Sequence, residues 1–150
     1  MKRPPAFWVI CIFHAIAAVL LLVGQTSAIF AYDWAVSLGL QESLEEVTPF
    51  GIQMNRAIGT GDTVVYIPLI IASLAGLILR KRWALPVTAA AMGVSAYWTV
   101  TMASLMYFAR SVPGYTLTPG IDYVIFVGSF FVFGVWGLLY IALRGDRLIA

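Results

Sequence analysis

The chain has 150 residues, of which 61% are hydrophobic and only 11% charged, and its net charge is +2. A soluble domain carries about 25% charged residues, so the composition excludes an ordinary soluble domain and indicates one integral membrane domain spanning residues 1–150. The small net charge and the scattered basic residues argue against nucleic acid as a partner. The single cysteine, Cys11, excludes an intramolecular disulfide. No spacing typical of a metal site occurs, and we expect neither a metal nor a cofactor.

Four apolar runs predict four membrane-spanning helices, at residues 7–30, 63–79, 84–108 and 123–143. Each run approaches or exceeds the ~20 residues that a helix needs to cross a bilayer. The first run is longer than the ~7–15 apolar residues of a signal peptide, so we expect it to stay as a helix. The predicted fold class is therefore an all-α integral membrane protein, a four-transmembrane-helix bundle.

The basic residues predict the orientation of these helices. Positive charges concentrate on cytoplasmic loops, and most of them fall on one side of a four-span chain: Lys2, Arg3, Arg80, Lys81, Arg82, Arg144 and Arg147. Arg56 and Arg110 fall on the other side. We expect both termini in the cytoplasm and the two long polar connections outside, which for a bacterial protein means the inner membrane and the periplasm.

The first outer connection predicts a short amphipathic helix on the membrane surface, over residues 34–47. Glu42, Glu45 and Glu46 share one helical face there, and Pro49 is expected to end the helix. Residues 59–62 predict a flexible turn, after which Asp62 or Thr60 would cap the second span. Asp122 is expected to cap the fourth span in the same way.

Ionisable side chains near the span ends are the first candidates for chemistry, because charges at membrane depth are costly and usually face the protein interior. Asp33 and Asp62 are expected to bind a cationic or hydroxyl group or to move a proton, with Arg56 or Arg110 as ion-pair partners. The alternative is structural: Asp62 caps a helix, and Arg110 extends to the headgroups.

Polar residues on two of the spans predict a pocket. On the third span Ser95, Trp98, Thr99 and Met102 recur at a spacing of three to four residues and so share a face. That face either lines a cavity or makes hydrogen bonds between helices. On the second span, a kink at Pro68 would open space beside Tyr66. The only histidine, His14, is either a proton carrier, an axial ligand or a hydrogen-bonded packing residue.

The second span also carries a family resemblance. The run Asp62-Thr63-Val64-Val65-Tyr66-Ile67-Pro68 places an acid six residues before a proline, and Trp83 follows a basic turn. The chain resembles the EXPERA family in these two features and in its four predicted spans with a long first loop. That family includes emopamil-binding protein and the sigma-2 receptor. The resemblance implies an intramembrane cavity for sterol-like lipophilic molecules, with Asp62 as an acid in that cavity.

These observations predict a small membrane protein that binds, or binds and converts, a lipophilic small molecule or lipid near the outer membrane face. The predicted ligand-binding residues are Asp33, Asp62, Tyr66, Trp98 and Thr99, and the candidates for catalysis are Asp62 and Asp33. The alternative is a non-catalytic accessory subunit of a larger membrane complex, or a homo-oligomer. Its contact surface would be the bulky run Phe126, Phe130, Phe131 and Phe133 on the fourth span.

Overall fold

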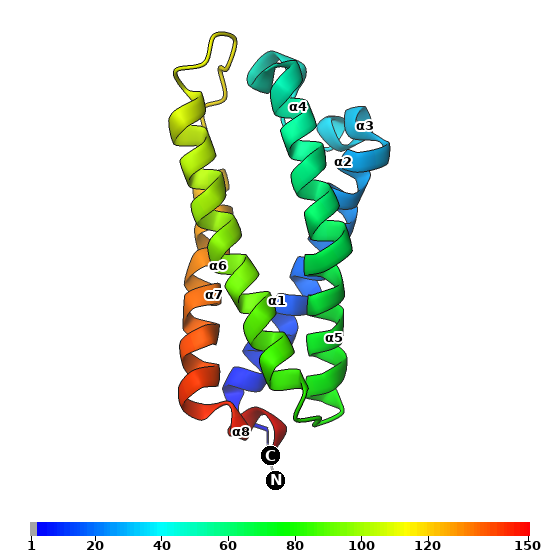
Figure 1. The fold of residues 1–150 in the computed structure, drawn as a ribbon, viewed down its shortest axis with the longest axis vertical. Helices are drawn as coiled ribbons and strands as arrows, with labels where there is room; N and C mark the ends of the chain where they lie inside the picture. Colours follow the sequence, from blue (N-terminus) through cyan, green and yellow to red (C-terminus); the bar gives the residue numbers. More distant parts are fainter. Residues whose placement is uncertain (1–2) are drawn as a thin grey trace.

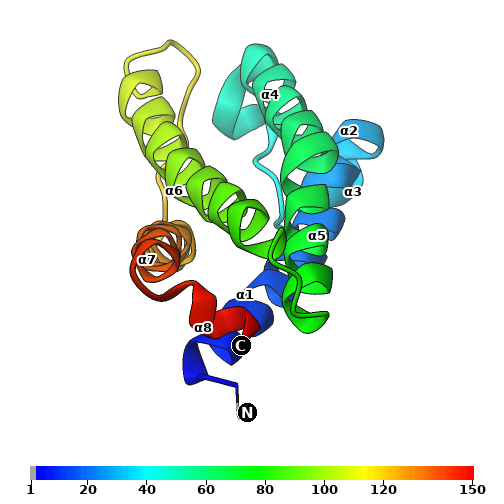
Figure 2. The same ribbon diagram turned by 60° about the horizontal axis from the view of Figure 1, so that its bottom comes forward.

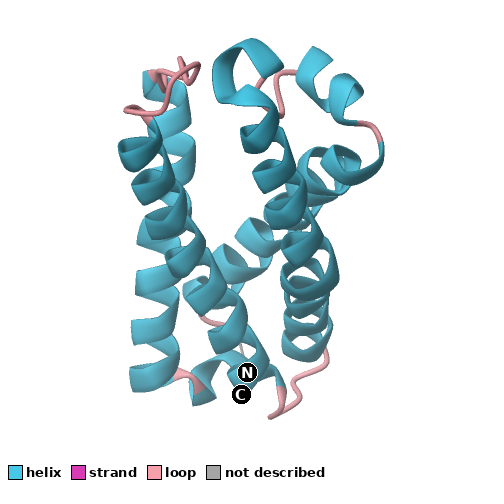
Figure 3. Ribbon diagram, turned by 45° about the horizontal axis from the view of Figure 1, so that its top comes forward, coloured by secondary structure: helices cyan, strands magenta, loops and turns pink. Residues whose placement is uncertain are grey.

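The computed structural model describes residues 3–150, and within that range every regular element is helical (Figures 1 and 3). The elements are α1 (Pro5–Leu21), η1 (Leu22–Thr26), α2 (Ser27–Phe30), α3 (Tyr32–Ser37), α4 (Leu44–Gly61), η2 (Asp62–Tyr66), α5 (Ile67–Ile78), α6 (Ala84–Ala109), α7 (Ile121–Arg144) and α8 (Asp146–Ile149). The segments η1 and η2 are π-helical, and each continues the α-helices on either side of it. The prediction of an all-helical chain is confirmed.

Three continuous helices within residues 3–150 are long and apolar enough to cross a membrane: Pro5–Phe30, Leu44–Ile78 and Ile121–Arg144. The first and third agree closely with the predicted runs 7–30 and 123–143. Helix α6 begins and ends where predicted, but its hydroxyl and aromatic polar groups lower its hydropathy, and it is not one of the three. The second helix is much longer than the predicted run 63–79.

The long helices lie side by side, with α6 packed along both α7 and α5, and α5 packed along α1 (Figures 1 and 2). The start of α1, α8 and the C-terminus lie near the turn between α5 and α6, at what we call the terminal end (Figure 1). The connections 38–43 and 110–120 lie at the opposite end, which we call the loop end. The ribbons of α4 and α6 diverge toward the loop end (Figures 1 and 2).

At the terminal end, α6 and α7 pack closely through small residues. A Cβ atom on Gly134 would lie 2.7 Å from the Met92 carbonyl oxygen and 2.8 Å from the Ala96 nitrogen. Small residues at such positions let helix backbones approach within a membrane. The Phe13 ring stacks on the Phe133 ring, with centroids 3.6 Å apart, and so ties α1 to the same contact.

A chain of hydrogen bonds joins α1, α5 and α6 within this core. His14 is fully buried, and its Nδ1 lies 3.1 Å from Ser73 Oγ, which lies 2.6 Å from Thr88 Oγ1. The Thr88 hydroxyl donates to the Ala84 carbonyl oxygen at 2.7 Å. Because that bond uses the only Thr88 hydroxyl proton, Ser73 donates to Thr88 and accepts from His14. The network therefore assigns the imidazole proton to Nδ1.

The predicted surface helix over residues 34–47 is wrong in its bounds. Helix α3 ends at Ser37, and α4 begins at Leu44 with a capping box between Ser43 and Glu46. Thr48 then leaves the helical conformation, with φ +68°, and its hydroxyl oxygen accepts a bond from the Gly51 N–H. Proline disfavours the α conformation in the residue before it but suits the first turn of a helix. The helical turn that starts at Leu44 therefore ends directly before Pro49, as predicted, and Pro49 begins the main part of α4.

The predicted turn at residues 59–62 is also helical, so neither Thr60 nor Asp62 is a cap. The Thr60 hydroxyl donates to the Arg56 carbonyl oxygen at 2.8 Å, and Asp62 opens the π-helical segment η2 inside a continuous helix. At the start of α7, Asp122 is exposed, and the first turn has no side-chain cap bond. The predicted cap at Asp122 is therefore not formed.

Candidate functional site

The five predicted binding residues do not line one cavity. Asp33 is exposed beside a shallow depression that Arg56 also lines at the loop end. Thr99 borders a separate open hollow on the outside of α6, together with Tyr107 and Phe131. Asp62 and Tyr66 are buried among the helices. Of the five, Trp98 alone lines the small space beside the cavity described below.

Tyr66 and Thr99 take part in hydrogen bonds between helices, which was the alternative interpretation of these polar faces. The Ser95 hydroxyl donates to the Ala91 carbonyl oxygen at 3.2 Å, so the Tyr66 hydroxyl donates to Ser95 Oγ. The Thr99 hydroxyl lies 3.0 Å from the Ser95 carbonyl oxygen and 3.2 Å from that of Val127 on α7. These bonds join η2 to α6 and α6 to α7.

Asp62 is only 5% exposed, and its Oδ2 atom has no hydrogen-bond partner. It lies in η2, which faces η1, and the hydroxyl oxygens of Thr26 and Thr63 lie 2.9 Å apart where the two segments meet. π-Helical turns inside α-helices are rare and occur often at functional sites. Asp62 therefore remains a candidate functional residue because it is buried, although it lines neither of the cavities described below.

The two arginines that were expected to pair with carboxylates are engaged elsewhere. Arg56 donates to the carbonyl oxygens of Ala28 and Ile29, at 3.3 Å each, at the C-terminal end of α2. A cation is favoured there, because the last carbonyls of a helix carry partial negative charge. The Arg110 guanidinium lies over the Tyr107 ring, 3.9 Å from its centroid. Neither arginine contributes a positive charge to the cavities.

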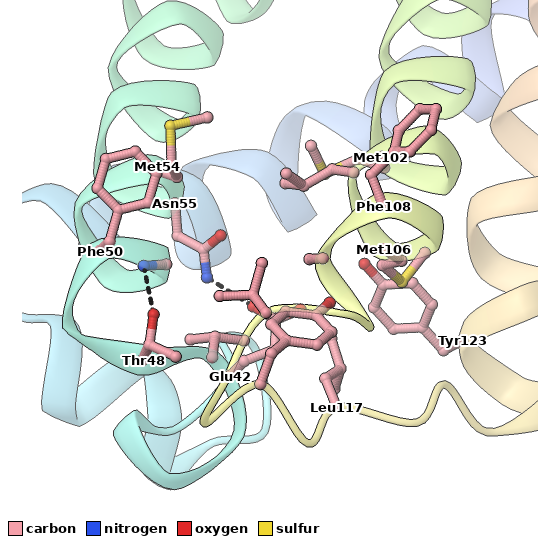
Figure 4. A pocket seen from close by; sticks show the side chains of 16 residues that line it. Glu42, Thr48, Phe50, Met54, Asn55, Met102, Met106, Phe108, Leu117 and Tyr123 are labelled. Carbon is pink, nitrogen blue, oxygen red and sulfur yellow. Dashed lines mark hydrogen bonds between the residues drawn. The ribbon is translucent and has the colours of Figure 1, made fainter.

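A mostly apolar cavity with a volume of about 260 Å³ lies at the loop end. Its walls come from α4, α6, the connection 110–120 and the start of α7 (Figure 4). They are mostly apolar: Val47, Phe50, Met54, Met102, Leu105, Met106, Phe108, Val112, Leu117 and Tyr123. The methionines add adaptability, since their flexible thioether side chains fit ligands of different shape. We call this space the outer cavity.

One side of the outer cavity is polar. Asn55 Nδ2 donates to Glu42 Oε2 at 2.7 Å, a bond drawn in Figure 4, and to the Tyr32 hydroxyl at 2.9 Å. The Tyr32 hydroxyl in turn donates to the Glu42 backbone carbonyl oxygen at 2.9 Å. Burial raises the pKa of the Glu42 carboxyl, and nearby Glu46 adds to the rise, while the hydrogen bonds oppose it. The three residues form a closed network that fixes the carboxyl in place.

A smaller space of about 80 Å³, which we call the inner chamber, adjoins the outer cavity. Glu42, Asn55, Met102 and Tyr123 line both spaces. The remaining walls of the chamber include two amides and an indole, from Gln25, Gln41 and Trp98. The Trp98 Nε1 atom is buried and has no hydrogen-bond partner. The site therefore combines an apolar space with a small polar one.

The connection 110–120 closes the site at the loop end. The backbone N–H groups of Thr116 and Leu117 donate to the Glu46 carbonyl oxygen, at 2.9 and 3.2 Å. The Thr116 hydroxyl donates to the Glu45 carbonyl oxygen at 2.9 Å. We call these three bonds the latch, because they join the connection to the first turn of α4 across the outer cavity. The latch is the direct link between the two walls that diverge at this end.

Sequence reasoning missed Glu42 and Asn55 as site residues, because it assigned them to a surface helix and a connection. A helix that starts at Pro49 would have placed Gly51, Met54, Asn55 and Ile58 on one face, and this spacing was the available signal. Met102, by contrast, belonged to the predicted polar face of α6 and does line both spaces.

The aromatic run of α7 is only partly available to a partner chain. Phe130 and Phe133 are buried within the molecule, at 3% and 8% exposure, and both contact Phe13 of α1. Phe126 and Phe131 are exposed. Of the four phenylalanines predicted to contact a larger complex, only these two are therefore accessible to a partner chain. Within residues 3–150, no group of three or more His, Cys, Asp and Glu side chains is placed to hold a metal ion.

No family model matches the chain, and comparisons with curated proteins and with solved structures also found no match. The resemblance to the EXPERA family therefore stays a prediction, and the geometry of the site carries the functional conclusion.

Proposed function

We propose that this protein is a four-helix integral membrane protein that binds a lipophilic small molecule in the outer cavity. The observation that carries the proposal is the cavity itself: apolar walls from two diverging helices, with one fixed carboxyl on its polar side. Small-molecule sites are typically concave, mostly apolar spaces of about 300–1,000 Å³ with a few well-placed polar groups. The outer cavity and the inner chamber together fall at the lower end of that range.

The chain path supports α6 as the fourth span. Helix α5 ends at the terminal end, and α7 begins at the loop end, so α6 has to return the chain between the two (Figure 1). Its 26 residues give a length of about 39 Å, enough to cross a hydrocarbon core about 30 Å thick. Its polar side chains Thr88, Ser95 and Thr99 are buried against other helices, away from lipid.

The basic residues support an orientation with the terminal end in the cytoplasm and the site near the outer face. Cysteine labelling with a membrane-impermeant reagent in intact cells tests this, after Cys11 is replaced by alanine. A cysteine at Leu44 should react, and one at Ala150 should not. The reverse pattern would place the cavity at the cytoplasmic face.

Occlusion of the outer cavity tests the binding function. We would prepare the protein in lipid nanodiscs and label it with decanol that carries a photoreactive diazirine. Adducts should concentrate on the cavity walls, within residues 47–54 and 102–117. Met106→Trp should remove them, because the larger ring fills the cavity. The matched control is Val132→Trp, since Val132 is 68% exposed on α7 and lines neither space.

Both proteins will also show adducts on lipid-facing positions of α7, and these serve as an internal reference. Cavity adducts that persist at the same level in a folded Met106→Trp protein would contradict the proposal. So would adducts confined to the lipid-facing positions of the unmodified protein.

A further inference from the structure

The depression that Asp33 and Arg56 both line is separate from the proposed ligand site. It shares no lining residue with the outer cavity or with the inner chamber. Its walls come from the end of α2, from α3 and from α4, and α2 packs against α4 beside it (Figure 1). Asp33 is exposed and Arg56 is half-buried, so both charged groups are accessible to a ligand. We call this feature the surface depression.

Two membrane-spanning helices place the surface depression at the level of the lipid headgroups. Phe30, at the end of the helix Pro5–Phe30, lies about 35 Å along that helix from Phe7. Arg56 lies about 33 Å from Ile78 along the helix Leu44–Ile78. The hydrocarbon core of a bilayer is about 30 Å thick, and the headgroups lie directly outside it. A bilayer that begins at the terminal end therefore has its opposite headgroups beside both residues.

Exposed aromatic side chains on the surface depression agree with this depth. Phe30 is 80% exposed and Trp34 is 50% exposed, and both line the depression. Tryptophan is enriched at the headgroup level of membranes, because its ring is apolar and its N–H is polar. The surface depression therefore combines apolar surface, suited to the upper part of an acyl chain, with two groups of opposite charge.

Arg56 keeps free donors for a ligand in this depression. A guanidinium has five N–H groups, and the bonds of Arg56 to the carbonyl oxygens of Ala28 and Ile29 come from Nε and Nη2. Both N–H groups of Nη1 and one of Nη2 are left. The two bonds also hold the guanidinium in place, so little conformational entropy is lost when a ligand binds. Such a fixed, planar cation with several donors matches the oxygens of a phosphate.

Asp33 supplies a negative charge in the same depression. It lies in the first turn of α3, and neither hydrogen bond of Arg56 goes to it. An anionic headgroup would be attracted by Arg56 but repelled by Asp33, and the reverse holds for a ligand with a positive charge alone. A headgroup that carries both a phosphate and an amine offers a partner of opposite charge to each side chain.

From this depth and these charges we infer that the surface depression binds the headgroup of a zwitterionic phospholipid, with its phosphate on Arg56 and its ammonium on Asp33. A primary ammonium, as in phosphatidylethanolamine, fits Asp33 best, because it donates hydrogen bonds to the carboxylate and a trimethylammonium has no N–H to donate. The inference shares with the proposed function only the membrane-spanning arrangement of the chain. It does not depend on a ligand in the outer cavity.

Lipid titrations of the full-length protein in detergent, followed by native mass spectrometry, test the inference. The probes are dioleoyl phosphatidylethanolamine, phosphatidylcholine and phosphatidylglycerol, each titrated separately. The dissociation constant of the first bound lipid should be about fivefold lower for phosphatidylethanolamine than for phosphatidylglycerol, with phosphatidylcholine between them. Glycerophosphoethanolamine has the same headgroup without acyl chains. It should not compete at lipid concentrations, because it lacks the apolar part.

Two substitutions assign this preference to the depression. Asp33→Asn removes the negative charge at nearly constant size, so phosphatidylethanolamine should bind about fivefold more weakly and phosphatidylglycerol no more weakly. Asp122→Asn is the matched control, since Asp122 is exposed at the start of α7 and lines neither the depression nor the outer cavity. Arg56→Gln should weaken all three phospholipids by about tenfold. Its melting temperature has to be measured as well, because Arg56 also bonds to α2.

Chemical coupling locates the bound amine on the unmodified protein. A water-soluble carbodiimide joins carboxyl groups to primary amines, so in nanodiscs of phosphatidylethanolamine it should attach the lipid to Asp33. Asp122 reports the background, because it is also exposed at the loop end. Peptide mass spectrometry should find several-fold more lipid on Asp33 than on Asp122. Equal coupling at the two residues would contradict a bound ammonium at Asp33.

Three binding results would overturn the inference. The first is an equal or higher affinity of the unmodified protein for phosphatidylglycerol, which would leave Asp33 without a role. The second is a preference for phosphatidylethanolamine that persists in Asp33→Asn. The third is competition by glycerophosphoethanolamine at lipid concentrations, which would assign the depression to a soluble phosphate compound. None of them bears on the proposed function, since labelling of the outer cavity by photoreactive decanol is measured separately.

Discussion

The terminal end and the loop end of this molecule use the same helices in different ways. At the terminal end, Gly134 lets α6 and α7 touch, and Ser73 links His14 to Thr88. At the loop end, the walls separate around a cavity. The buried Trp98 Nε1 atom beside it has no partner, and neither has Asp62 Oδ2, midway along the helix Leu44–Ile78. The terminal end also has one such atom, His14 Nε2, on a ring whose other nitrogen is bonded.

This difference indicates a division between stability and recognition. Close packing and paired polar groups stabilise a fold. Cavities and unpaired buried polar groups lower its stability, and they are retained where a ligand fills the cavity or pairs with the group. Substitutions at the terminal end should therefore act mainly on unfolding, and those at the loop end mainly on binding. The substitutions below test this contrast.

The largest effect is expected at Gly134. A methyl group there would meet the backbone of α6 at 2.7–2.8 Å, so Gly134→Ala has to push α6 and α7 apart. We expect a loss of about 3 kcal/mol, at the upper end of the range for overpacking. Gly128→Ala is the matched control on the same helix, because nothing lies within 4 Å of the position that its methyl group would take. Thermal unfolding in detergent measures both, and equal losses would contradict the close contact.

Ser73→Ala should have the next largest effect. The substitution removes the hydroxyl that accepts from His14 and donates to Thr88. The buried His14 N–H is then left without a partner, whereas Thr88 keeps its bond to the Ala84 carbonyl oxygen. The expected loss of unfolding free energy is about 2 kcal/mol. Ser129→Ala serves as the control, since Ser129 is exposed and bonds only within its own helix; its effect should stay within about 0.5 kcal/mol. An unchanged melting temperature for Ser73→Ala would show that the network does not stabilise the core.

Asp62→Asn should raise stability, in contrast to the two losses above. An unpaired carboxyl oxygen in the helix interior is unfavourable, and the amide is easier to bury, so we expect a gain of about 1 kcal/mol. The exposed Asp122→Asn should change little. A loss of about 3–5 kcal/mol in Asp62→Asn would instead show that the carboxylate has a cationic partner in the membrane.

The ends of α6 and α7 could be predicted from the sequence for a simple physical reason. A basic turn precedes Ala84, and Pro119 and Gly120 precede Ile121, so polar and helix-breaking residues mark both boundaries. The apolar runs between them are long enough to leave little choice of structure. The boundary residues and the length of the runs agree for both helices, and the observed bounds lie within two residues of the predicted ones.

The course of α4 could not be predicted in the same way, because tertiary contacts decide it. Asn55, Arg56 and Asp62 look like loop residues in an otherwise apolar chain. In the structure Asn55 bonds to Tyr32 and Glu42, and Arg56 bonds to the end of α2. Those partners lie 13 to 28 positions away along the chain. The site was missed for the same reason, since Glu42 and Asn55 belong together only once these contacts form.

Glu42 should make stability depend on pH. Its folded pKa is raised, so the folded protein binds more protons than the unfolded chain between the two pKa values. The contribution of Glu42 is therefore greatest below the ordinary pKa of glutamate, about 4.3, and is lost as pH rises through the folded pKa. Melting temperatures measured from acid to neutral pH should fall over this interval, and Glu42→Gln should flatten the fall. A slope that persists unchanged in Glu42→Gln would assign it to another group.

The smallest effect on stability, and a distinct effect on kinetics, is expected from the latch. The Thr116 hydroxyl is exposed and makes one bond to the Glu45 carbonyl oxygen, while two backbone bonds to Glu46 remain in Thr116→Ala. The loss should therefore be only about 0.5 kcal/mol, at the low end for a hydrogen bond. The bond nevertheless joins the connection 110–120 to α4 across the outer cavity, so its removal should let the two walls separate more often.

Exchange of bound decanol should accordingly become faster in Thr116→Ala, in both association and dissociation, with little change in affinity. Thr118→Ala is the matched control, because the Thr118 hydroxyl bonds only to the nearby Thr116 carbonyl oxygen. Labelling by the photoreactive decanol after rapid mixing, followed over time, measures the rates. Equal rates in the two variants would mean that the ligand enters by another route, between the helices from the lipid. In that case the loop end would be a fixed wall of the site. The two ends of the molecule would then differ in packing and in unpaired polar groups, but not in motion.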